Sequence, residues 1–189
     1  MKACILSGNT REKSNTEAVT EIFADELAAR GVEVRLFKLR EKDIRPCVGC
    51  GACHGVMDAF GCVIDDDMSE MAGELADADI LVFSSPIYTW MPTPLLKSVV
   101  DRLYAFTKYP DDGSEFNLIR AKRFAMIATS GDECVANCDL FDEAIRRMAK
   151  FAGVSYAGYF AAQDKGREYI TGKEVEDGAR AFAGKCLEG

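Results

Sequence analysis

Residues 3–16 read ACILSGNTREKSNT and decide the fold. The apolar run Ala3–Ser7 has the length of a buried strand, and a polar loop follows it. Ser14 and Glu17 then match the capping-box pattern of a helix start, and apolar side chains recur on one face of the next segment as far as Leu27. The stretch therefore predicts a strand, a polar loop and a helix in succession.

The same alternation of apolar runs and helical periods continues along the chain. Further strands are expected at Val32–Leu39, Ile80–Ser84, Phe124–Thr129 and Val154–Ala161. Helices are expected at about Asp67–Ala76, from Pro92 or Pro94 to about Tyr104, over Leu140–Phe151, and from about Lys173. Parallel strands need crossovers, so this pattern predicts a parallel sheet covered by helices on both faces. Five strands in a chain of this length favour a flavodoxin-like, three-layer α/β sandwich with strand order 2-1-3-4-5.

Length and composition fit one domain. The chain has 189 residues, of which 48% are hydrophobic, and 31 acidic against 23 basic side chains give a net charge of −8. An acidic balance argues against a nucleic-acid partner. No apolar run approaches the ~20 residues that span a bilayer, and the N-terminal run is too short for a signal peptide. We therefore expect a single cytoplasmic domain over residues 1–189 with no membrane partner, and a cysteine-rich insertion at about residues 41–66.

The loop after the first strand carries groups that suit a phosphate. Arg11 offers a planar guanidinium, Ser14 and Thr16 offer hydroxyls, and Asn9 and Asn15 offer amide donors. Such donors at a helix N-terminus favour anion binding. The alternative is a capped helix after a polar turn, with Arg11 in solvent.

Parallel strands of a doubly wound sheet present their carboxyl ends at one edge, where ligands bind. The predicted strand order therefore brings three loops to one rim. These loops are Gly8–Asn15, Ser85–Met91 and Ser130–Cys138.

Four of the eight cysteines follow a C-x2-C-x2-C-x8-C pattern, at Cys47, Cys50, Cys53 and Cys62. Disulfides are rare in a reducing compartment, so this pattern indicates metal or redox chemistry. Close spacing with intervening glycines can direct several thiolates to one centre, as a [4Fe–4S] cluster requires. Structural zinc more often uses two separated cysteine pairs. Zinc, a redox disulfide and free thiols stay open as alternatives.

The other cysteines give weaker signals. Cys4 in the first strand and Cys186 in the last helix are expected to be packing residues. Cys134 and Cys138 fit either an oxidisable pair or an ordinary loop and helix start. The acidic run at residues 65–67 is interpreted as a helix N-terminus, where the helix dipole favours carboxylates.

Two of these motifs resemble a known family. Gly8–Arg11 with Ser14–Thr16 resembles the G-S-x-R-x-x-[GS]-N-T loop of the NADPH-dependent FMN reductase and iron–sulfur flavoprotein group, with Asn9 where serine is usual. Ser85–Tyr88 resembles the S-P-[IV]-Y loop of that group. A lysine and an Asp-Arg pair follow this loop in the group, and Lys97, Asp101 and Arg102 match them.

The cysteine pattern adds to this resemblance. With Pro46 before it and residues 66–68 after it, the pattern is similar to the compact cysteine motif of iron–sulfur flavoproteins, although the gap before Cys62 is longer. The resemblance covers roughly residues 1–132 and implies FMN, with a [4Fe–4S] cluster on the four cysteines and NAD(P)H as the electron donor.

The resemblance also implies which residues hold FMN. The 5′-phosphate would be held by Asn9, Arg11, Ser14, Asn15 and Thr16. The isoalloxazine ring would run beside Pro86, Ile87, Tyr88, Thr89, Trp90 and Met91, and Ser130 and Gly131 would close its other edge. For Tyr88 and Trp90, a core lid or a dimer contact is the alternative.

The expected function is an FMN-dependent oxidoreductase that exchanges electrons with a small-molecule or protein partner. A neighbouring cluster would convert two-electron into one-electron transfer, and no side chain is assigned an acid–base role because the chemistry belongs to the cofactor. The resemblance implies a homodimer or homotetramer. A non-enzymatic, flavodoxin-like electron carrier and a thiol- or cluster-based redox sensor are the alternatives. The absence of a G-x-S-x-G motif excludes an α/β-hydrolase.

Overall fold

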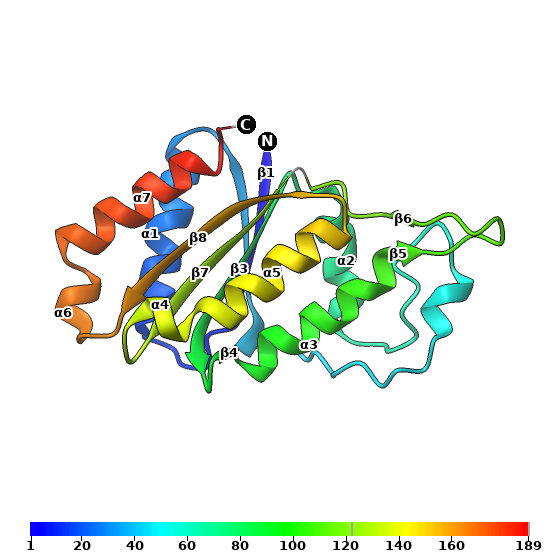
Figure 1. The fold of residues 1–189 in the computed structure, drawn as a ribbon, viewed down its shortest axis with the longest axis horizontal. Coiled ribbons are helices and arrows are strands. Elements are labelled where there is room, and N and C mark those ends of the chain that lie inside the picture. The colour runs from blue at the N-terminus through cyan, green and yellow to red at the C-terminus, as the bar shows by residue number, and fades with distance from the viewer. Residues whose placement is uncertain (122, 189) are drawn as a thin grey trace.

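The computed structural model describes residues 1–121 and 123–188, and Figure 1 shows their arrangement. The principal strands and helices, in chain order, are β1 (Lys2–Ser7), α1 (Asn15–Ala29), β2 (Glu33–Lys38), α2 (Asp67–Asp77), β3 (Ile80–Tyr88), α3 (Pro94–Arg102), β7 (Arg123–Ser130), α5 (Asp139–Phe151), β8 (Ser155–Gln163) and α7 (Lys173–Lys185). Among the described helices, none combines the length and hydrophobicity needed to cross a lipid bilayer.

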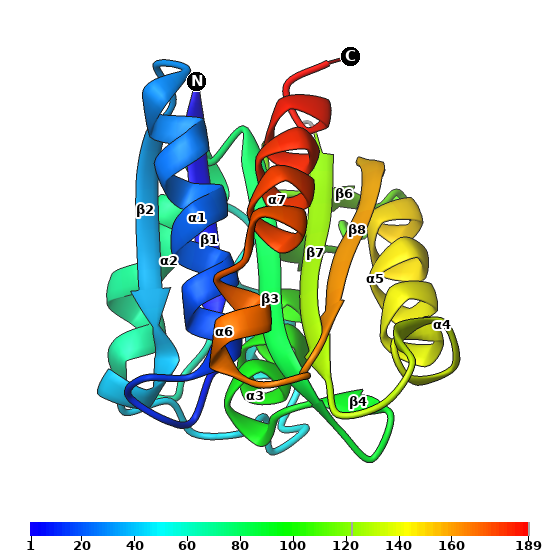
Figure 2. The same ribbon diagram turned by 90° about the vertical axis from the view of Figure 1, so that its left-hand side faces the viewer.

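The five long strands form one parallel sheet in the order β2-β1-β3-β7-β8, side by side in Figure 2. Because β1 pairs with β2 from Lys2 opposite Glu33 and with β3 from Ala3 opposite Ile80, it lies inside the sheet. Counted along the chain, this is the predicted order 2-1-3-4-5, and the prediction of a flavodoxin-like fold is confirmed.

Helices cover both faces of the sheet. On one face, Ile5 and Val82 pack with side chains of α1 and α7, the two helices in front of the strands in Figure 2. On the other face, Leu6 and Phe83 pack with side chains of α2, α3 and α5. Successive strand residues thus enter opposite cores, which explains why the strands are apolar without alternation. The same packing buries Cys4 and Cys186, as predicted.

The predicted loop Ser85–Met91 is wrong in its first half. Ser85–Tyr88 continue β3, because the parallel pairing with β7 persists as far as Pro86. The chain then turns back through β4 (Met91–Pro92), which pairs antiparallel with the end of β3. Consequently α3 begins at Pro94, not Pro92, with Thr93 as its N-cap.

The remaining elements are short pieces that the sequence patterns did not predict. They are the 3-10 turns η1 (Leu39–Glu41), η2 (Ala52–Gly55) and η3 (Leu103–Phe106), the strands β5 (Thr107–Lys108) and β6 (Phe116–Asn117), and the one-turn helices α4 (Cys134–Asn137) and α6 (Arg167–Ile170). Segments of two to four residues are too short to show a hydrophobic period.

The close approach of β1 and α3 leaves no room for a side chain at Gly8. The Gly8 amide donates to the Ser84 carbonyl at 2.8 Å, and the Thr93 hydroxyl donates to the Gly8 carbonyl at 2.6 Å. A Cβ added at Gly8 would lie 2.6 Å from the Cβ of Leu96. The start of α3 is therefore fixed against the end of β1.

Replacing Gly8 by alanine should lower the free energy of unfolding by about 1–3 kcal/mol, the usual cost of overpacking. The matched control is Gly73→Ala in the middle of α2, where an added Cβ meets nothing within 4 Å. That change should stabilise the protein by about 0.5–1 kcal/mol, because alanine loses less backbone entropy than glycine. Urea denaturation of both variants measures the difference, and equal stabilities would contradict the close-approach account.

Candidate functional site

A cavity of about 180 Å³, here called the rim cavity, lies at the carboxyl ends of β1, β3, β7 and β8. It is lined by Asn9, Arg11, Lys13, Ser14, Asn15, Thr16, Pro86, Ile87, Tyr88, Thr129, Ser130, Gly131 and Asp164. The structure thus brings together all the predicted residues of the first loop with Pro86–Tyr88, Ser130 and Gly131. The other three predicted residues, Thr89, Trp90 and Met91, do not line it.

Three lining residues were not predicted: Lys13, Thr129 and Asp164. Asp164 directly follows β8, and its Oδ1 accepts a hydrogen bond of 2.6 Å from the Asn15 amide. The rule that loops gather at the carboxyl ends of parallel strands applies to this fourth loop as well. The rule therefore also predicts that the loop after β8, which begins at Asp164, lies at this rim.

The side chain of Asn9 shapes the loop between β1 and α1. It is buried, and its amide Nδ2 donates to Glu17 Oε2 at 2.9 Å and to the Arg11 carbonyl. Its Oδ1 accepts from the Arg11 amide at 3.2 Å. Asn9 therefore fixes the backbone from which Arg11 extends.

Glu17 is the buried anion beneath this loop. Ser14 Oγ accepts from the Glu17 amide at 3.0 Å, which is half of a capping box. The other half is absent, because the Glu17 carboxylate instead meets Lys38 Nζ at 2.5 Å and Arg40 Nη1 at 3.0 Å. Burial acts to raise the pKa of Glu17, but hydrogen bonds from Lys38 and Arg40 outweigh it and hold the pKa below its ordinary value.

Hydroxyl pairs join the first loop and α1 to the neighbouring strands. Thr16 Oγ1 lies 2.6 Å from Thr129 Oγ1 at the end of β7, and Thr20 Oγ1 lies 2.6 Å from Ser84 Oγ in β3. At the mouth of the rim cavity, Thr10 Oγ1 lies 3.1 Å from the hydroxyl of Tyr88. These contacts hold the polar wall at fixed positions relative to the strand ends.

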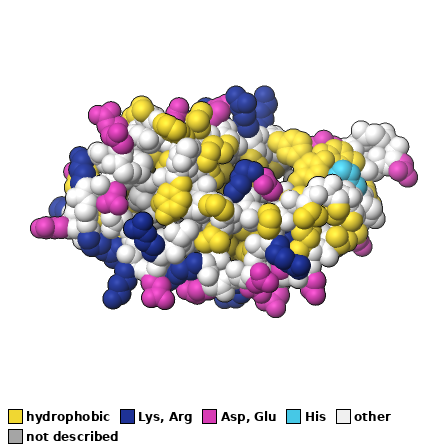
Figure 3. Space-filling view, turned by 90° about the horizontal axis from the view of Figure 1, so that it is seen from below, with side chains coloured by type: hydrophobic (Ala, Val, Ile, Leu, Met, Phe, Trp, Pro, Cys, Tyr) yellow, Lys and Arg dark blue, Asp and Glu magenta, His cyan; other side chains and the backbone are white. Residues whose placement is uncertain are grey.

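The hairpin between β3 and β4 presents large apolar side chains beside the rim cavity. Tyr88, Trp90 and Met91 are exposed by 42%, 51% and 38%. Thr89 and Trp90 have φ of 51° and 64°. A two-residue hairpin with a type I′ turn requires positive φ at both central residues, where glycine and asparagine are preferred. Figure 3, seen from below, shows several hydrophobic patches on this face, the densest around the histidine, with charged side chains between and around them.

The four motif cysteines lie in the segment between η1 and α2, residues 41–66, here called the cysteine loop. All are free thiols: Cys47 and Cys50 are exposed, and Cys53 and Cys62 are half-buried. Burial, together with the neighbouring Cys62 and Cys50, raises the pKa of the Cys53 thiol. Within residues 1–121 and 123–188, no three His, Cys, Asp or Glu side chains converge closely enough to hold a metal ion.

A buried ion pair fixes the end of the cysteine loop. Arg102 Nη1 lies 2.5 Å from Asp66 Oδ2, and both side chains are almost fully buried. Asp66 also caps α2 by accepting from the Met68 amide, as the acidic run predicted, and accepts from the Arg45 amide at 2.8 Å. Burial acts to raise the pKa of Asp66, but the bonds from Arg102 and these amides lower it below its ordinary value.

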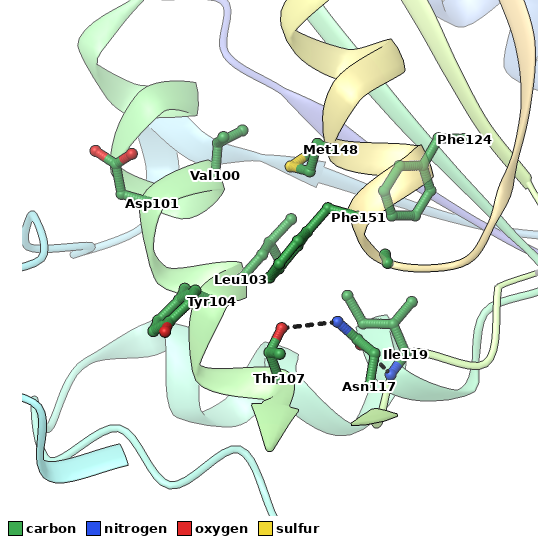
Figure 4. Close-up of a pocket in the computed structure, with 11 residues that line it drawn as sticks. Val100, Asp101, Leu103, Tyr104, Thr107, Asn117, Ile119, Phe124, Met148 and Phe151 are labelled. Carbon is green, nitrogen blue, oxygen red and sulfur yellow. Dashed lines mark hydrogen bonds between the residues drawn. The ribbon is translucent and has the colours of Figure 1, made fainter. Parts of the chain in front are cut away.

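A second cavity of about 210 Å³ lies between α3 and α5. Val100, Leu103, Met148 and Phe151 give it an apolar wall (Figure 4). It contacts Phe124 near the start of β7, away from the strand carboxyl ends, and carries few polar groups. The rim cavity is therefore the better candidate for a cofactor.

Comparison with known proteins identifies the family of the chain. The sequence profile of the NADPH-dependent FMN reductase family matches residues 1–140. The chain belongs to this family. Membership confirms the resemblance seen in the motifs.

Iron–sulfur flavoproteins of archaea are among its relatives. One from Archaeoglobus fulgidus is 30% identical over 94% of this chain and 89% of its own length. Another, from Methanocaldococcus jannaschii, is 30% identical over 54% of this chain, and the match spans only about half of that relative, 51%.

Solved structures share the fold. An NAD(P)H:quinone oxidoreductase from Methanothermobacter marburgensis superposes with a TM-score of 0.76, covering 100% of this chain and 97% of its own, at 16% identity. An FMN-dependent NADH-azoreductase from Bacillus anthracis, in complex with FMN, superposes with a TM-score of 0.70 at 14% identity and covers 100% of both chains.

Substituting Glu17 by glutamine should lower the free energy of unfolding at pH 7 by about 2–3 kcal/mol, because Lys38 and Arg40 lose their buried anion. The pKa of Glu17 is depressed in the folded state, so its contribution is complete above the unfolded pKa and disappears as pH falls through the folded pKa. The difference from wild type should therefore shrink below pH ~4.5. Urea titrations between pH 3 and pH 7 measure it, and a constant difference over that range would disprove the ionic role.

Proposed function

We propose that the protein uses FMN bound in the rim cavity to carry out oxidoreductase chemistry, with NAD(P)H as the electron donor. The observation that carries this proposal is the convergence of cationic, hydroxyl and amide groups with the apolar end of β3 in one cavity, in a member of the NADPH-dependent FMN reductase family.

The polar wall fits the phosphate of FMN. Arg11 is exposed at the cavity, and Lys13 adds a second cation. Ser14 and Asn15 stand at the start of α1, where free backbone amides and the helix dipole favour an anion. Thr16, fixed against β7, supplies a further hydroxyl.

The size of the cavity suggests where the ring would lie. A volume of about 180 Å³ is below the ~300–1,000 Å³ typical of small-molecule sites. The enclosed part of the rim cavity would therefore receive the phosphate and ribityl chain of FMN. The isoalloxazine ring would then lie beside Pro86–Tyr88 and the exposed hairpin, with Ser130 and Gly131 at its edge.

The cysteine loop has the donor chemistry of a [4Fe–4S] cluster. Cys47, Cys50, Cys53 and Cys62 are all free thiols, and Cys53 lies close enough to Cys50 and Cys62 for their charges to act on it. We propose these four cysteines as its ligands.

The two groups would divide the chemistry between them. FMN, when bound, accepts two electrons as a hydride and can release them singly, and a cluster passes one electron at a time. The side chains of the protein would bind FMN and orient it. Arg11 and the α1 terminus hold the phosphate, while Asp164 fixes Asn15 and accepts from the Gly166 amide at 3.1 Å.

We also propose that residues 1–189 form one domain with the cysteine loop inserted after β2, and that the protein forms a homodimer or homotetramer. The exposed apolar side chains of Tyr88, Trp90 and Met91 support self-association, because a second chain would remove them from water.

Arg11→Ala should weaken FMN binding at least about tenfold, since one hydrogen-bonded cation at a phosphate contributes ~1.5–3 kcal/mol. Arg147→Ala is the matched control, because Arg147 is exposed on α5 and pairs with Glu143, away from the rim cavity. Fluorescence titration of apoprotein with FMN measures both. Unchanged affinity for Arg11→Ala, with the fold intact by circular dichroism, would overturn the phosphate assignment.

Cys50→Ser should abolish iron absorption and leave FMN binding intact. The protein is purified without oxygen, and iron, sulfide and flavin are measured on one sample, with Cys134→Ser as a half-buried cysteine outside the loop. Loss of iron and flavin together would show that the loop is part of the flavin pocket. Wild-type protein with flavin but no iron would assign the cysteines a thiol role.

A further inference from the structure

Lys108 is a buried lysine without a carboxylate partner. It ends β5, its side chain is inaccessible to solvent, and its Nζ donates to the Ala105 carbonyl at 2.7 Å. In the part of the chain that the structure describes, no Asp or Glu forms an ion pair with it. A buried ammonium without an anion costs several kcal/mol, so such groups are normally paired.

The cysteine loop lies against this lysine. Burial lowers the pKa of Lys108, and Cys53 and Asp58 lie close enough to act against that shift. The His54 ring contacts Tyr104 and Tyr109 at centroid distances of 5.5 and 5.8 Å, which holds the loop on the segment that carries β5. Figure 1 shows the loop beside the β5–β6 hairpin.

A second buried cation lies at the other end of the loop. The Arg102 guanidinium pairs with Asp66 through Nη1, but its Nε is buried without a hydrogen-bond partner. The Arg102 Nη2 donates to the Ile64 carbonyl at 3.3 Å, which places the guanidinium two residues from Cys62. Arg102 therefore keeps one buried donor without a partner, in a guanidinium bonded to backbone at the end of the cysteine loop.

We propose that Lys108 and Arg102 are the cationic partners of an anionic metal cluster held by the cysteine loop, Lys108 beside Cys53 and Arg102 beside Cys62. This inference rests on the cluster in the proposed function. Four thiolates leave an iron–sulfur cluster with a net negative charge, and neighbouring charges and hydrogen bonds to sulfur set its reduction potential. The cluster would supply the anion that Lys108 lacks.

The two cations differ in how they can be tested. Arg102 also fixes Asp66 at the start of α2, so its loss would disturb the fold. Lys108 bonds a single backbone carbonyl, so its charge can be removed with little change of shape. Lys108 is a positioning and charge-compensating residue, and its effect should appear in the potential and stability of the cluster.

The experiment compares wild type, Lys108→Gln, Lys108→Met and Lys108→Arg, each purified without oxygen as the full chain. Glutamine keeps a donor for Ala105 while losing the charge, methionine keeps the length, and arginine keeps the charge. Lys97→Met is the control, because Lys97 is exposed and paired with Asp101. Iron, sulfide and flavin contents, the midpoint potentials of cluster and flavin, and the rate of iron loss to a chelator are measured.

Both neutral variants should lower the midpoint potential of the cluster, because a lost positive charge disfavours its reduced form, and should lose iron roughly tenfold faster. Lys108→Arg should restore both values, and the flavin potential should not move. If a neutral variant that folds keeps the wild-type cluster potential and rate of iron loss, the role of Lys108 is overturned, but the cluster is not. Wild-type protein that binds FMN but no iron would overturn the cluster and this inference together.

Discussion

The structure depends on the contact between the end of β1 and the start of α3 at Gly8. The strand can lie inside the sheet and pair with β3 because its backbone amide reaches Ser84, while its carbonyl accepts from Thr93 at the N-cap of α3. A side chain at Gly8 would collide with Leu96. The first loop therefore starts beside Ser84 and Thr93, which stand before and after the β3–β4 hairpin, and the rim cavity lies between this loop and the end of β3. Its position is a consequence of strand order.

Two buried carboxylates hold the segments that lack regular structure. Glu17 ties the first loop to Lys38 and Arg40 at the end of β2, and Asp66 ties the end of the cysteine loop to Arg102. Each sits at or near a helix start, where amides and the dipole already favour an anion. An unpaired buried charge would be costly, so each carboxylate and its cations are stable only together, and the loop between them is held as a result.

The sequence predicted what local period and composition determine. The apolar runs gave every long strand, because a strand buried on both faces must be continuously apolar. Features that depend on pairing between distant segments were not predicted. The extension of β3 to Tyr88 follows from its pairing with β7. Glu17 resembles a capping residue in the sequence, and only the folded chain brings Lys38 and Arg40 to it. Lys108 gave no signal at all. In the sequence this lysine resembles any solvated side chain, and only the three-dimensional structure shows that it is buried.

The same topology explains how one small sheet could serve two redox groups. In a parallel sheet every crossover leaves from the carboxyl edge, so the first loop after β1 and the cysteine loop after β2 both start at that edge. The α1 helix then returns along one face, while α2, α3 and the cysteine loop lie on the other. The insertion after β2 lengthens the connection to α2, and two of its side chains, Ile44 and Phe60, pack against the core on that face. Under the proposed function its constraint is charge, because thiolates that held a cluster would lie near Lys108 and Arg102, two buried cations.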